Sequence, residues 1–104
     1  MSSTPNESEV NEQEPSPVDL SSLDIYQLVE FFIMLLSEKA WRYIGVRVEP
    51  GTNKMNKDLA KARVTIDCIL ALVDKIEPNL DSKEVESLRR LITDLQINYA
   101  EHMK

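Results

Sequence analysis

Apolar residues recur at alternating spacings of three and four along the second half of the chain. They form one run of Leu59, Ala62, Ile66, Ile69, Val73 and Ile76, and a second run of Val85, Leu88, Ile92, Leu95 and Tyr99. This spacing places each run along one side of an α-helix, which has 3.6 residues per turn. Pro78 cannot continue the first helix, so only residues 78–81 separate the two runs. So short a link predicts an antiparallel helix hairpin packed along these runs.

Capping residues predict where these two helices begin and end. Asn56 is a good N-cap for the first of them, which we expect over about 57–77. Asp81, with Glu84 three residues later, has the pattern of a capping box and opens a helix over about 82–102.

A third helix is predicted earlier in the chain, over about 24–45. Asp24 and Gln27 have the same capping-box pattern, and Gly45 is placed to end the helix in a left-handed turn. The residues that follow, 46–55, contain the turn signal Pro50-Gly51 and form a connector. Its first residues favour a short extended segment, but we expect no partner strand for it.

The helix at 24–45 must cover what the hairpin leaves open. At about 100° per residue, its apolar side chains fill roughly half of its circumference, which predicts that it sits on both other helices. These side chains are Ile25, Leu28, Val29, Phe32, Ile33, Leu35, Leu36, Ala40, Tyr43 and Ile44. The helix at 57–77 also has a strip of small residues away from its main run: Ala60, Val64, Cys68 and Ala71. This strip either receives the first helix closely or stays exposed for another copy.

The first 23 residues have the composition of a disordered segment. They contain five of the 18 acidic residues, none of the 12 basic residues and three of the five prolines. No aromatic residue precedes Tyr26, so this segment cannot bury enough apolar surface to offset the entropy lost on ordering. We therefore predict a disordered acidic tail at 1–23 and one three-helix domain at 24–104. Removing residues 1–20 should leave the thermal stability nearly unchanged.

The charge pattern argues against nucleic acid as a partner. The net charge is −6, but without the five acidic residues of the tail it is near −1. The basic residues are scattered among acidic ones, whereas nucleic-acid binding needs clustered cations. The longest apolar stretch, residues 28–36, is too short to span a bilayer and contains Glu30. Without the pattern of a signal peptide, we expect a cytoplasmic protein that does not bind membranes.

The two apolar runs and their surroundings also carry a resemblance. The residues concerned are Leu59-Ala60, Ile66-Asp67, Leu70, Leu72, Lys75, Asn79-Leu80, Leu88, Leu91, Asp94-Leu95 and Tyr99. With them, the chain from about Tyr26 onward resembles a bacterial family catalogued as domain of unknown function 1844. That family usually has Gly before the Asn-Leu step and Arg after the Asp-Leu pair, where this chain has Pro78 and Gln96. The resemblance implies a small helical bacterial protein without established activity, and no catalytic residues to carry over.

No arrangement of residues in the sequence is typical of catalysis. Cys68 and His102 are the only thiol and imidazole; we expect Cys68 to act as an inert small hydrophobe and His102 to lie at a helix end. One Cys and one His on different helices make no metal motif, and two glycines cannot form a phosphate-binding loop. We predict that the protein is not an enzyme and has no catalytic residue, cofactor or metal ion.

Asp67 lies at the edge of the first apolar run, between Ile66 and Cys68. A carboxylate at such an edge more often forms a structural ion pair than takes part in acid–base chemistry. Lys39 and Arg63 are the expected partners.

Large apolar side chains also occur on the polar side of the helix at 24–45. Phe31, Met34 and Trp41 lie outside its main apolar arc and are surplus to a three-helix core. Either the connector folds back over them, or they anchor a protein–protein interface. We favour a non-catalytic interaction module that self-associates through this helix as a symmetric dimer.

Two other functions remain open. An adaptor or accessory subunit would bind a heterologous protein through the same three side chains. A ligand-binding bundle would need a cavity lined by Phe32, Leu36 and Tyr43 with a convergent polar group, and the sequence offers no such group.

Overall fold

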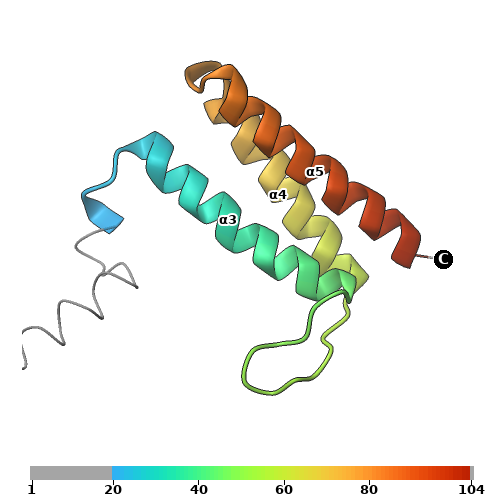
Figure 1. The fold of residues 1–104 in the computed structure, drawn as a ribbon. Coiled ribbons are helices and arrows are strands. Elements are labelled where there is room, and N and C mark those ends of the chain that lie inside the picture. The colour runs from blue at the N-terminus through green and yellow to red at the C-terminus, as the bar shows by residue number, and fades with distance from the viewer. Residues whose placement is uncertain (1–19, 104) are drawn as a thin grey trace, which may run out of the picture.

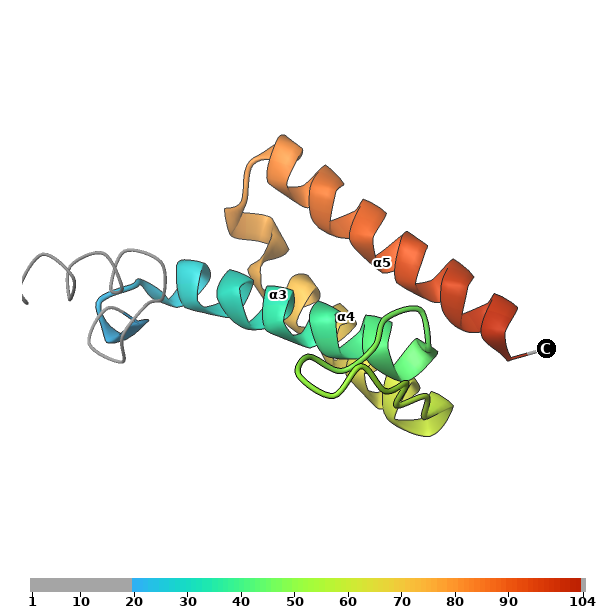
Figure 2. The same ribbon diagram turned by 60° about the horizontal axis from the view of Figure 1, so that its bottom comes forward.

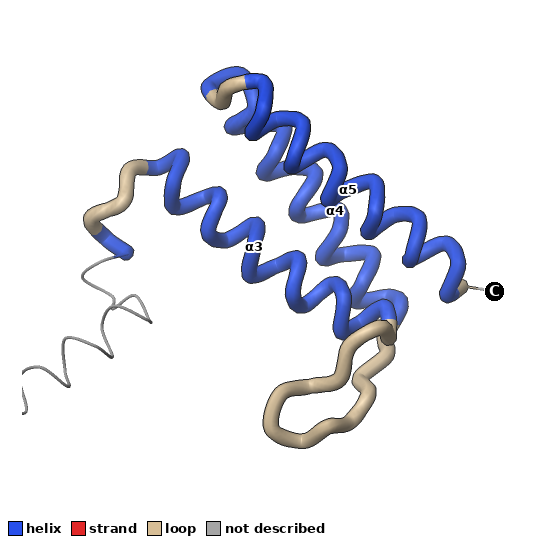
Figure 3. The backbone as a smooth tube through the Cα atoms, viewed as in Figure 1, coloured by secondary structure: helices blue, strands red, loops and turns tan. Residues whose placement is uncertain are grey.

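The computed structural model describes residues 20–103 of the chain. Its helices are α3 (Ile25–Ile44), α4 (Leu59–Ile76), the 3-10 turn η1 (Glu77–Asn79) and α5 (Ser82–His102). Among the described residues, these elements are joined by loops (Figures 1 and 3), which confirms the predicted all-α fold. Residues 1–19 lie outside the described residues, so the acidic tail at 1–23 and the domain limits at 24–104 stay predictions.

Both predicted capping boxes are confirmed. At the start of α3, Asp24 accepts a hydrogen bond from the Gln27 backbone N–H at 2.9 Å, and the Gln27 side chain accepts one from the Asp24 N–H at 3.2 Å. Asp81 and Glu84 make the same pair of bonds at the start of α5, at 2.8 and 3.2 Å. These bonds satisfy backbone N–H groups that have no partner within the helix.

The N-cap of α4 is Asp58, so the prediction of Asn56 was wrong. Asp58 accepts a hydrogen bond from the Lys61 backbone N–H at 3.1 Å. Its own N–H donates to the Tyr43 carbonyl at 2.8 Å and so joins the start of α4 to the end of α3. The side-chain NH2 group of Asn56, two residues before this cap, donates to Glu49 at 3.3 Å.

The connector between α3 and α4 folds back on itself and on α3. Val48 pairs with Met55 in an isolated antiparallel bridge, and this pairing does not extend into a strand. Arg47 forms an ion pair with Glu38, and its guanidinium lies 6.0 Å from the centre of the Trp41 ring. The connector therefore rests against the second half of α3.

The two helices that follow the connector run in opposite directions. Arg89, early in α5, hydrogen-bonds Asp74, late in α4, whereas Tyr99, late in α5, shares a groove with Arg63, early in α4. The most extensive packing of the fold, however, is between α3 and α4. Figure 1 shows α4 between α3 and α5, and Figure 2 shows α5 on one side of the α3–α4 pair.

The core lies between α3 and α4, and α5 closes it on one side. The buried apolar residues are Ile33, Ala40, Ile44, Ala62, Ile66, Ile69, Val73, Ile76, Ile92 and Leu95. Two buried hydroxyls, of Ser37 and Thr65, donate to carbonyls of their own helices, both at 2.8 Å. The apolar run of α4 is thus buried as its spacing predicted.

The apolar arc of α3 is covered over only part of its width. Ile25 is 61% exposed, Phe32 43% and Leu35 49%, so the expectation that they pack on the other helices was wrong. The reason is the position of α5, whose first turns meet the opposite side of α3, around Glu30 and Met34. One flank of the arc is therefore left without a neighbour.

Candidate functional site

Exposed apolar side chains gather where α3 and α4 lie side by side. We call this surface the apolar strip and define it by Ile25, Phe32, Leu35, Val64, Cys68 and Ala71. Val64 is 63% exposed, and Cys68 is an exposed free thiol. The small residues of α4 are exposed rather than closely packed under α3: Ala60, Val64, Cys68 and Ala71.

The middle of the apolar strip is hollowed. The hollow has a volume of about 540 Å³ and is lined by Phe32, Leu35, Leu36, Cys68, Ala71 and Leu72. Its shape follows from side-chain size, because Phe32 and Leu35 project from α3 whereas Cys68 and Ala71 leave the surface of α4 low. None of the lining residues offers the convergent polar group that a small-molecule site needs for orientation.

Two lysine side chains lie near the end of the apolar strip that is closest to Tyr43. The ammonium groups of Lys39 and Lys61 lie 5.4 and 5.8 Å from the centre of the Tyr43 ring, in cation–π geometry. Tyr43 is in the last turn of α3, so these cations are displaced from the hollow at mid-helix. A partner seated in the hollow meets no charge there.

The three predicted interface residues do not form one exposed surface. Met34 is 65% exposed and lines a smaller depression of about 300 Å³ beside α5. Phe31 is half-buried, with its ring centre 6.1 Å from that of Phe32. Trp41 is also half-buried, packed against the core and beside Arg47. A role for the three in binding a partner stays a prediction.

Comparison with known protein families gave a match that covers the same three helices. A family model described as "Domain of unknown function (DUF1844)" matches residues 26–101. The chain belongs to this family. The match contains nearly all of α3, α4 and α5 and confirms the resemblance seen in the apolar runs. Comparison with curated proteins and with solved structures gave no match.

Asp67, one of the residues that carry the family resemblance, has a position that fits a structural role. Asp67 lies in the groove between α4 and α5, near Arg63 and Gln96. Among residues 20–103, no ion pair within 4.0 Å joins Asp67 to Lys39 or Arg63, so the predicted pair was wrong. Lys39 instead lies over Tyr43.

The remaining candidates for chemistry lie apart. The Nδ1 atom of His102 is 2.9 Å from the Asn98 carbonyl of the same helix, whereas Cys68 belongs to the apolar strip. Within the part of the chain that the structure describes, no three His, Cys, Asp or Glu side chains are placed to hold a metal ion. No helix in that part is long and apolar enough to cross a bilayer.

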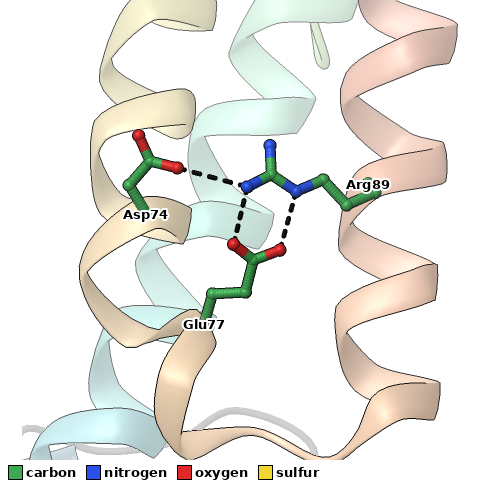
Figure 4. A network of polar contacts seen from close by, with 3 residues as sticks. All are labelled: Asp74, Glu77 and Arg89. Atoms are coloured by element: carbon green, nitrogen blue, oxygen red, sulfur yellow. Dashed lines mark hydrogen bonds and ion pairs between the residues drawn. The ribbon is translucent and has the colours of Figure 1, made fainter.

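The strongest polar contact joins α4 and η1 to α5. The guanidinium of Arg89 donates to both carboxylate oxygens of Glu77, at 2.7 and 2.6 Å, and to Asp74 at 3.2 Å (Figure 4). The hydrogen bond from Arg89 lowers the pKa of Glu77, and the bond to Glu77 raises the pKa of Arg89. This geometry is that of a structural link, because every charge in it has a partner.

A cluster of carboxylates lies at the same end of the fold. Burial raises the pKa of Glu30, and repulsion from Glu84, Asp24 and Asp81 raises it further. Two of these neighbours are the N-caps of α3 and α5, where a carboxylate is favoured by the helix dipole. Helix capping therefore accounts for the acidic character of this end.

Proposed function

We propose that the protein is a non-catalytic interaction module that self-associates through a surface including α3. The observation that carries the proposal is the exposure of Phe32 and Leu35 in the middle of α3, beside the most extensively packed helix pair. Completing the burial of such a half-exposed side chain contributes about 1 kcal/mol. A symmetric contact includes every such side chain twice, so each exposed side chain contributes from both copies.

The three residues singled out in the sequence define a second candidate contact surface on α3. Met34 is exposed on the flank of α3 opposite to the apolar strip, with Phe31 and Trp41 half-buried near it in the helix. A contact on that flank would still use α3 but would lie beside α5. The proposal includes the bacterial origin and cytoplasmic location expected from the sequence, with neither membranes nor nucleic acid as partners.

The alternative function is that of an adaptor or accessory subunit. The same exposed apolar surface suits an amphipathic helix of another protein, whose apolar side chains would occupy the hollow. Self-association is preferred because a folded part of about 80 residues has a small core and gains stability from a second copy.

Mass in solution tests the proposal. Light scattering of the full chain at tens of micromolar should give twice the mass of one chain. A single-chain mass at this concentration would contradict self-association. Affinity purification from native lysate tests the alternative: a heterologous protein recovered in equal amounts, and lost with Leu35→Glu, would favour the adaptor.

A further inference from the structure

The apolar strip is self-complementary in shape, because it has both a ridge and a hollow. Phe32 and Leu35 form a ridge on α3, and the hollow beside Cys68 and Ala71 lies directly next to it. When two such surfaces face each other about a two-fold axis, the ridge of each copy can enter the hollow of the other. A surface that has both features fits a second copy of the same chain.

The area is also sufficient. Helices α3 and α4 have 20 and 18 residues, which at 1.5 Å per residue makes each about 30 Å long. Two adjacent helices about 10 Å in diameter present a face of roughly 600 Å² before the relief of side chains is included. Stable interfaces bury about 800 Å² per partner, so the face is close to what a small dimer needs.

The opposite flank of α3 is a less favourable surface for binding a second copy. The depression at Met34 is bordered by the charged side chains Glu30, Lys83 and Glu84, and α5 limits its width. Burying those charges without partners is unfavourable. The hollow of the apolar strip has no charged lining residue, so a second copy covers it without that cost.

We infer that the apolar strip is the contact between two copies of this chain. In this contact, the ridge on α3 of each copy is seated in the hollow on α4 of the other. The inference rests on the proposed self-association and adds to it the surface and the pairing of helices.

Two neighbouring residues of α3 provide a matched test. Leu35 belongs to the ridge, whereas Met34 points to the opposite flank, and both are exposed, so Glu is tolerated by the fold at either position. Sedimentation equilibrium of the full chain should show a dimer for the wild type and for Met34→Glu. Leu35→Glu should raise the dimer dissociation constant at least tenfold. Ala71→Arg should do the same, since it fills the hollow without removing a contact within the subunit.

The outcomes separate this inference from the proposed function. A dimer that persists in Leu35→Glu and Ala71→Arg but dissociates in Met34→Glu would overturn the inference and leave self-association standing on the other flank. A monomeric wild type would overturn both. Circular dichroism of each variant verifies that it is folded.

The single cysteine gives an independent measurement. If the partner's ridge covers Cys68, N-ethylmaleimide should modify it several times more slowly in the concentrated wild type than in Leu35→Glu at the same concentration. Dilution of the wild type should remove the difference. Equal rates in the concentrated wild type and in Leu35→Glu would overturn the proposed pairing of helices.

Discussion

Arg89 holds the end of α4 and the turn η1 to the first half of α5 through hydrogen bonds to Glu77 and Asp74. The two-pronged contact with Glu77 fixes the orientation of the guanidinium, which a single ion pair does not. Because Arg89 lowers the pKa of Glu77 from its ordinary value of 4.5, the folded state favours the ionised carboxylate. The pair therefore stabilises the fold above pH 4.5, and this contribution is lost as the pH falls through the lowered pKa.

The variant Arg89→Met tests this dependence. Its melting temperature should be below that of the wild type at neutral pH, and the difference should shrink as the pH falls below about 4.5. Arg90→Met is the matched control, because the ion pair of Arg90 within residues 20–103 is with Glu86 of its own helix, and both side chains are well exposed. A difference for Arg89→Met that stays constant into strong acid would contradict the role assigned to Glu77.

Helix α3 ends at Gly45, whose φ of 102° lies in the left-handed region. Its N–H donates to the carbonyls of Trp41 and Arg42, at 3.2 and 3.1 Å, which closes the last turn. A Cβ atom at this position would lie 3.2 Å from the Lys57 side chain. Backbone conformation and crowding both favour glycine here.

We expect Gly45→Ala to destabilise the protein by about 1–2 kcal/mol, the usual cost of a left-handed conformation for an L residue. Gly51 has a φ of 85° but no atom within 4 Å of a Cβ placed there. Gly51→Ala should therefore cost less, because the connector can relax around it. Urea denaturation of both variants measures the difference, and equal losses would contradict the role of the Gly45 turn.

The ends of the helices could be predicted wherever a cap depends on residues close in the sequence. Asp24, Gly45 and Asp81 are such cases. The prediction failed at Asn56, because the Tyr43 carbonyl, a group distant in the sequence, accepts the Asp58 N–H at the place where the helix begins. A capping rule considers only residues close in the sequence, so it cannot predict contacts between the two ends of a connector.

The candidate site was predicted only in part for a related reason. The spacing of apolar residues gave the width of the arc on α3, but it could not show which flank α5 would cover. Packing α5 near Met34 left Phe32 and Leu35 exposed, whereas the sequence placed them in the core. The sequence indicated an excess of apolar surface on α3. The position of this surface depends on which flank α5 covers, and a helical wheel of α3 does not contain that information.

The whole molecule is a pair of closely packed helices, α3 and α4, with a third helix on one side of them. In Figure 2, α5 lies on one side of the pair, and the connector lies near the second half of α3. Among residues 20–103, part of the pair has no neighbour, since Phe32 and Leu35 are exposed. A second copy placed there would give each chain a covered surface on both sides of its central pair. The stability of the fold would then increase with protein concentration, because the concentration sets the fraction of chains in the dimer.

Thermal unfolding at several protein concentrations tests this dependence. The melting temperature of the wild type should rise by a few degrees for each tenfold increase in concentration, because association stabilises the folded state. Leu35→Glu should melt at a constant temperature over the same range, and Met34→Glu should follow the wild type. A constant melting temperature for the wild type would contradict an association linked to folding.

The hydrogen bond between the Asp58 N–H and the Tyr43 carbonyl fastens the two ends of the connector together. Whatever chain lies between these ends can change in length without moving the helices they belong to. The tip at Pro50-Gly51 is thus a natural place for inserting a fluorophore-binding peptide or an epitope, which would report on assembly while leaving the paired helices undisturbed.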